Sequence, residues 1–133
     1  MLKTVVARKM LNYSVKSDLP GRLRIVFEHY EKLPKEAEQY LHYIDEALRM
    51  LNGVKKVELN TVTGSILLIS DKSLANKKIL RWIDTIINEG LVVYEKIAKE
   101  NIKDPILVEK RAEQYLKQSL SQAVATFNEK KEE

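Results

Sequence analysis

The sequence contains no cysteine, and this absence excludes several kinds of chemistry. Without thiols the chain forms no disulfide, no thiolate zinc or iron–sulfur site and no cysteine nucleophile. Its two histidines fall on separate predicted elements, so no base is expected beside a serine, threonine or lysine nucleophile. The four glycines are each explained by a turn or a helix end, which leaves none for a phosphate-binding loop. We therefore expect no enzyme activity, and no cofactor beyond, at most, a metal ion.

Long apolar runs are also missing. The longest, such as 66–69 and 91–93, are far shorter than the roughly 18 residues of a membrane-spanning helix. The first nine residues place basic side chains inside an apolar stretch, unlike a secretory signal. We expect a cytoplasmic protein that reaches a membrane only through a partner. The net charge of +4 would suit an anionic partner, although a mild lysine excess is more typical of a solvated surface.

The sequence has 133 residues, of which 44% are hydrophobic. This length and composition are enough for one folded domain. Alternating apolar residues from Leu23 to Phe27 predict a first strand. A helix then begins near Pro34 and ends at Asn52-Gly53. Its apolar stripe has three- and four-residue spacing and comprises Ala37, Tyr40, Leu41, Ile44, Ala47, Leu48 and Leu51.

Two further strands, 54–60 and 65–70, are separated by the turn residues 61–64 and predict an antiparallel hairpin. The second of them is apolar on both faces, as expected of an interior strand. A second helix is predicted from Leu74 to a stop at Gly90, followed by a fourth strand at 91–94.

The order strand, helix, strand, strand, helix, strand predicts an α+β fold. In this ferredoxin-like βαββαβ arrangement, two helices lie on one face of an antiparallel sheet and the other face is bare. An extra C-terminal helix follows Asp104-Pro105. We expect that helix to fold back over the bare face; the rival is pairing with its copy in a homodimer.

The start of the chain is harder to interpret. Residues 12–17 alternate weakly and would extend the first strand beyond a kink at Pro20-Gly21. We therefore divide the chain into an N-terminal extension (1–19), a ferredoxin-like domain (20–98), a C-terminal amphipathic helix (105–128) and a frayed tail (129–133).

Three segments resemble the heavy-metal-associated domain family. They are Pro20-Gly21-Arg22-Leu23-Arg24-Ile25, then 51–60 (LNGVKKVELN), then 63–69 (TGSILLI). The first and last are similar to a cysteine-less branch found as stand-alone proteins and at the N-termini of bacterial metal-transporting P-type ATPases. The resemblance covers residues 20–97 and implies a link to metal homeostasis.

Metallochaperones of that family carry a Cys-x-x-Cys pair after the first strand, which binds soft ions such as Cu(I). Here the loop at 28–33 has no cysteine, so thiolate metal transfer is not implied. Glu28, His29 and Glu31 would suit iron, manganese or zinc by ligand type, but a solvated loop is the simpler interpretation. His42 is likewise expected on a helix surface.

Arg22, Arg24, Lys55 and Lys56 are expected near one end or face of the sheet. They would dock an acidic protein domain or lipid head groups, and the simpler interpretation is again a solvated face. RNA-recognition domains of the same fold stack bases on aromatic residues of the central strands. The strands here offer mainly Ile, Leu and Val, so nucleic acid is not an expected partner.

The sequence therefore predicts a non-enzymatic accessory or regulatory protein of metal homeostasis. It would act by contact with a protein partner, such as a metal-transport P-type ATPase or a related metal-handling component. The alternative is a ferredoxin-like module that binds a small ligand or nucleic acid, since this scaffold serves many unrelated tasks.

Overall fold

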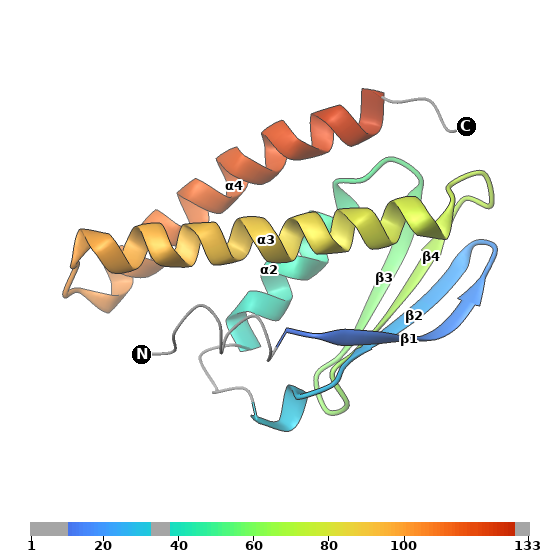
Figure 1. The fold of residues 1–133 in the computed structure, drawn as a ribbon, viewed down its shortest axis with the longest axis horizontal. Coiled ribbons are helices and arrows are strands. Elements are labelled where there is room, and N and C mark those ends of the chain that lie inside the picture. The colour runs from blue at the N-terminus through green and yellow to red at the C-terminus, as the bar shows by residue number, and fades with distance from the viewer. Residues whose placement is uncertain (1–10, 33–37, 130–133) are drawn as a thin grey trace.

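The computed structural model describes residues 11–32 and 38–129. Within these ranges the chain forms one four-stranded antiparallel sheet and three α-helices, which lie together on one side of the sheet (Figure 1). The strands are ordered β1-β2-β4-β3 across the sheet. Their bounds are Tyr13–Leu19 for β1, Arg22–Phe27 for β2, Val54–Asn60 for β3 and Ser65–Ser70 for β4.

The predicted fold class is confirmed. The sheet is antiparallel, β4 is interior as expected, and α2 (Glu38–Arg49) and α3 (Asn76–Glu100) cover one face of the sheet. Between β2 and α2, residues Tyr30–Lys32 form a short 3-10 helix. Pro34 and Ala37, with which the first helix was expected to begin, lie outside the described residues.

The prediction of a fourth strand at 91–94 was wrong. These residues continue α3, which runs through Gly90 and ends at Glu100, with Asn101 in the left-handed conformation (φ 56°). A glycine inside a helix costs only about 1 kcal/mol, whereas Leu91 and Val93 are buried in this conformation. Burial of apolar side chains therefore outweighs the helix-stopping tendency of Gly90.

The position that a fourth strand would occupy beside β2 is taken by β1, from the segment predicted as an N-terminal extension. Pro20 and Gly21 reverse the chain instead of kinking one strand, so Tyr13 pairs with Phe27 and Leu19 with Arg22. Gly21 has a φ of 77°, and proline followed by such a glycine is typical of a type II turn. The expectation that residues 12–17 extend the first strand was wrong, because they form its hairpin partner.

The core lies between the sheet and the helices. Side chains of β2 and β4 that point toward the helices are almost completely buried: Leu23, Ile25, Phe27, Ile66 and Leu68. Trp82 of α3 is also fully buried, and its indole N–H donates to the carbonyl oxygen of Ala47 in α2 at 2.8 Å. This bond satisfies the one polar group of a large core side chain.

The C-terminal helix α4 runs over Pro105–Glu129 and packs on α3, on the side away from the sheet (Figure 1). Phe127 contacts Trp82, while the Asn128 side chain accepts from the backbone N–H of Asn52 and donates to the carbonyl of Met50. The helix therefore packs within its own chain, but the prediction that it covers the bare sheet face was wrong. Residues 130–133 of the predicted tail lie outside the described residues.

The two outer strands each carry an irregular feature. β1 has a register shift between Val15 and Ser17, and β3 has one between Val54 and Lys56. On β3, the guanidinium of Arg49 from α2 also donates to the carbonyl oxygen of Val57 at 3.0 Å.

Candidate functional site

The sheet face opposite the helices is the principal candidate site. We call it the open face and define it by six residues: Arg22, Arg24, Lys56, Glu58, Leu67 and Ile69. They alternate with the buried residues of the same strands, so they point away from the core. The register aligns them in two rows, Arg22–Ile69–Lys56 and Arg24–Leu67–Glu58.

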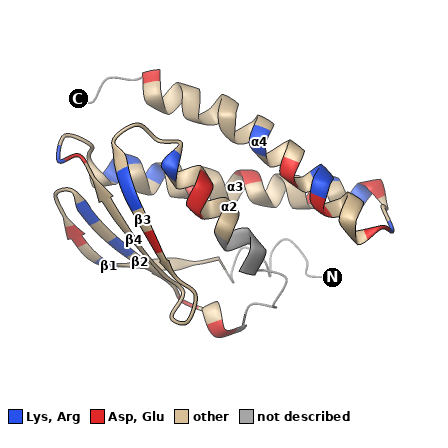
Figure 2. Ribbon diagram, turned by 180° about the vertical axis from the view of Figure 1, so that it is seen from behind, with Lys and Arg blue, Asp and Glu red and all other residues tan. Residues whose placement is uncertain are grey.

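The open face is apolar along its centre and charged at its sides. Leu67 and Ile69 of the interior strand β4 are half-buried, whereas the arginines of β2 and the charged residues of β3 are exposed. Leu19 pairs with Arg22 on the neighbouring strand and is 54% exposed. Figure 2 shows the basic positions on β2 and the mixed charges on β3. This surface can contact apolar groups and anions at the same time.

Positive charge dominates the open face. The Lys56 ammonium lies 2.7 Å from the Glu58 carboxylate. This bond, the charge of Lys56 and, more weakly, Arg24 and Arg22 lower the pKa of Glu58. Within the described part of the chain, neither arginine side chain forms a hydrogen bond or ion pair, so both guanidinium groups are available to an incoming anion.

Of the four basic residues predicted for partner binding, Arg22, Arg24 and Lys56 lie on the open face, and Lys55 has no aligned partner on β4. Lys55 falls at the irregularity of β3, and its ammonium lies 2.9 Å from the Asp71 carboxylate. The apolar pattern of β4 predicts that either Leu67 and Ile69 or Ile66 and Leu68 lie on the face away from the helices, and the structure places Leu67 and Ile69 there, half-buried. Their place on the interior strand, opposite Arg24 and Arg22, comes from strand pairing rather than from a local motif.

A shallow recess continues the open face toward the β3–β4 hairpin. The residues that line it together with Arg24 are mostly polar: Glu58, Asn60, Thr61, Thr63 and Ser65, with Leu59 and Leu67. The Asn60 carboxamide oxygen accepts the backbone N–H groups of Val62 and Thr63, which fixes the turn. The recess thus adds hydroxyl donors beside a cation.

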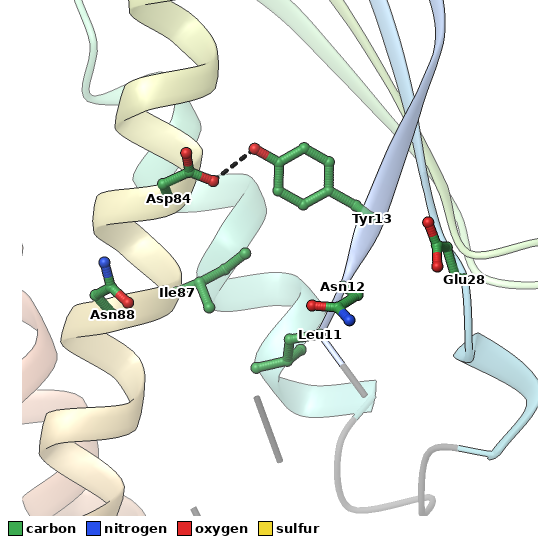
Figure 3. Close-up of a pocket in the computed structure, with 7 residues that line it drawn as sticks. All are labelled: Leu11, Asn12, Tyr13, Glu28, Asp84, Ile87 and Asn88. Carbon is green, nitrogen blue, oxygen red and sulfur yellow. Dashed lines mark hydrogen bonds between the residues drawn. The ribbon is translucent and has the colours of Figure 1, made fainter. Parts of the chain in front are cut away.

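A second recess lies between the start of β1 and α3 (Figure 3). Here the Tyr13 hydroxyl donates to the Asp84 carboxylate at 2.6 Å, and burial, followed by this bond and the charge of Asp84, raises the pKa of Tyr13. The remaining lining residues are Leu11, Asn12, Glu28, Ile87 and Asn88. Its two carboxylates suit cationic groups rather than anions.

The structure does not combine the candidate metal ligands into one site. Glu28 lines the second recess, whereas His29 and Glu31 are not among the residues that line it. No group of three His, Asp or Glu side chains within 11–32 and 38–129 could hold a metal ion. A thiolate site does not fit this chain either, because it has no cysteine. His42 is exposed on α2, as predicted.

Aromatic residues of the described strands lie on the helix side. Phe27 is buried, and the Tyr13 ring meets it edge-on with 6.3 Å between the ring centroids. These strands therefore present no ring on the open face on which a base could stack.

Together these features define an α+β domain with a ferredoxin-like sheet, one covered face and one open, basic face. The chain matches the family described as heavy metal associated domain 2 over residues 7–130, and it belongs to this family. The match extends beyond residues 20–97, where the sequence resemblance was found, and includes both β1 and α4. Membership connects the chain with metal handling.

Searches of curated proteins and of solved structures give no match to this chain. Among the helices in the described part, none is long and apolar enough to cross a membrane.

Proposed function

We propose that this chain is a non-enzymatic accessory protein of a metal-handling system, and that it acts by binding a protein partner through the open face. The proposed partner is the cytoplasmic part of a metal-transporting P-type ATPase or a related component. Family membership supports the metal connection. The observation that carries the mode of action is the open face, where Arg22 and Arg24, which form no ion pair with a described residue, lie beside Leu67 and Ile69.

The side-chain chemistry of the open face supports protein contact. Protein interfaces combine an apolar centre with a polar rim, and arginine is enriched in them. The open face has this composition, with apolar side chains on β4 and charged ones on β2 and β3. Nucleic-acid binding, the alternative, is less well supported because the open face has no aromatic ring among its described residues and includes the carboxylate of Glu58.

The proposal is tested by affinity capture in the native host with the tagged full chain, followed by identification of proteins and bound metals. The test variant is Arg22→Glu/Arg24→Glu. Its matched control is Lys77→Glu/Lys110→Glu, which makes the same change in net charge at exposed positions of α3 and α4.

We expect a metal-transporting ATPase or another metal-handling protein to be enriched with the wild type and with the control, and to be lost with the open-face variant. The proposal fails if no such protein is enriched, or if the open-face variant captures it as well as the wild type does.

A further inference from the structure

The arrangement of charged and apolar side chains on the open face restricts the kind of segment that fits it, and this inference rests on the proposed function. Arg22 and Arg24 stand side by side along β2, about 6.6 Å apart in the strand direction. Leu67 and Ile69 run beside them on β4, at the same level in each row. The partner must therefore present anions and apolar groups in two parallel lines.

A second copy of this chain does not meet that requirement. The open face carries three cations and a single carboxylate, and that carboxylate is already bonded to Lys56. Two copies placed face to face would oppose like charges, which is destabilising. The occupant is instead a partner with an acidic surface.

The backbone of the sheet restricts the conformation of the occupant. β4 lies between β2 and β3 and pairs with both, so its amide and carbonyl groups are used within the sheet. An extended peptide lying on this face would find no backbone partner for its own polar groups. A helix satisfies its backbone internally and needs only side-chain contacts.

The spacing of residues along a helix also matches the distance between Arg22 and Arg24 along β2. Residues four apart in a helix are separated by about 6 Å along its axis and lie on one face, close to the spacing of Arg22 and Arg24. Residues at i−1 and i+3 then form an adjacent stripe at nearly the same two levels along the axis. We infer that the open face binds an amphipathic helix of a protein partner, with carboxylates at i and i+4 on Arg22 and Arg24 and apolar residues at i−1 and i+3 on Ile69 and Leu67.

The test uses two labelled helical peptides and the full chain, with binding measured by fluorescence anisotropy. One peptide has Glu at i and i+4 and Leu at i−1 and i+3, and the other replaces both Glu residues with Lys. We expect the acidic peptide to bind about tenfold more tightly or better, with an affinity that falls as salt is raised.

The double variants used to test the proposed function serve as controls for the peptide experiment. Arg22→Glu/Arg24→Glu should reverse the preference between the peptides, and Lys77→Glu/Lys110→Glu should keep it. Circular dichroism shows whether each variant is folded, and Arg22→Gln/Arg24→Gln gives a milder version in which the preference is lost but not reversed.

Equal binding of both peptides, or an unchanged preference in a folded Arg22→Glu/Arg24→Glu variant, overturns the inference. Binding of the wild type to anionic phospholipid vesicles but not to the acidic peptide overturns it in favour of lipid. Acidic-peptide binding without capture of any metal-handling protein would refute the proposed function and leave this inference standing, so the two failures are distinguishable.

Discussion

Phe127, near the end of α4, packs edge-on against Trp82 of α3, with 5.1 Å between the ring centroids. Because the Trp82 indole also bonds to Ala47, one buried side chain joins α2, α3 and α4. The contact attaches the C-terminal helix to its own domain.

Replacement of Phe127 by alanine should therefore destabilise the whole domain. We expect the free energy of unfolding to fall by about 2–3 kcal/mol, because a half-buried aromatic side chain and its ring contact are lost. Urea unfolding measures the change. Thr126→Ala, at the exposed neighbouring position, is the control and should alter stability by less than about 0.5 kcal/mol. Equal stability of Phe127→Ala and the wild type would show that α4 is not docked on Trp82.

Replacement of Gly90 by alanine tests the continuity of α3. A Cβ atom at this position would meet no atom within 4 Å, and alanine favours a helix over glycine. We expect a gain of about 0.5–1 kcal/mol in the free energy of unfolding, measured in the same way. A loss of stability would indicate a break in the helix at this point.

Gly64→Ala is the matched control for that substitution. Gly64 has a φ of 73°, and a Cβ atom there would lie 2.4 Å from Cγ of Tyr30. The same chemical change should therefore destabilise the protein, which excludes a general benefit of replacing glycine.

Removal of residues 1–19 tests whether β1 is an integral strand. The truncated chain would expose the backbone of β2 along the edge that β1 now covers, and it would lose the contact between Asp18 and the Asn76 carboxamide at 2.6 Å. We expect it to unfold or aggregate, as judged by circular dichroism and size-exclusion chromatography. A stable, monomeric truncated protein would contradict the role of β1 in the sheet.

The Tyr13–Asp84 bond predicts a pH dependence of stability. The pKa of Tyr13 is raised in the folded state, so above its ordinary value of about 10 the unfolded chain releases the proton first. The stability that the raised pKa of Tyr13 contributes is fully present below that pH and is lost as the pH rises further. Tyr13→Phe should cost about 1 kcal/mol at neutral pH, and its disadvantage relative to the wild type should shrink in alkali. Unfolding measured from about pH 8 to about pH 11.5 checks this, and a constant difference would contradict it.

Calorimetric titration with Fe(II), Mn(II) and Zn(II) tests the loop after β2. Because no group of three His, Asp or Glu side chains among the described residues could hold a metal ion, we expect Glu28, His29 and Glu31 not to share one. The titration should show no saturable heat at micromolar metal. Saturable binding that disappears in Glu28→Gln or His29→Ala would show that the loop does bind a metal ion.

Much of the fold could be predicted because most of its elements bury one face. Leu23, Ile25 and Phe27 alternate along β2, and the apolar residues of α2 and α4 recur at helical spacing. Residues 91–94 were misassigned because a short apolar run after a glycine fits a strand and a buried helix equally well. The buried helix is favoured over the strand because α4 packs against α3. A local sequence pattern does not reveal this contact, since α4 is distant in sequence.

The edge strand β1 was missed for a different reason. Tyr13–Leu19 is mostly polar and partly exposed, so it lacks a clear apolar face. The Pro20-Gly21 pair was the available signal, since it is a frequent turn sequence.

The candidate site, like the fold, could be predicted from the sequence only in part. Arg22 and Arg24 could be assigned to a sheet face from their alternation with buried residues, but the register shift that separates Lys55 from Lys56 has no sequence signature. Tyr13 and Asp84, 71 residues apart, are brought together only by the folded chain.

The Arg49 bond to the carbonyl oxygen of Val57 has a consequence for solubility. It occupies an acceptor on the outermost strand β3, and the register shifts in β1 and β3 distort the hydrogen-bonding pattern at both margins of the sheet. Neighbouring molecules are therefore hindered from joining their strands into ribbons. The open face can therefore stay exposed while the margins of the sheet disfavour strand pairing with a neighbour.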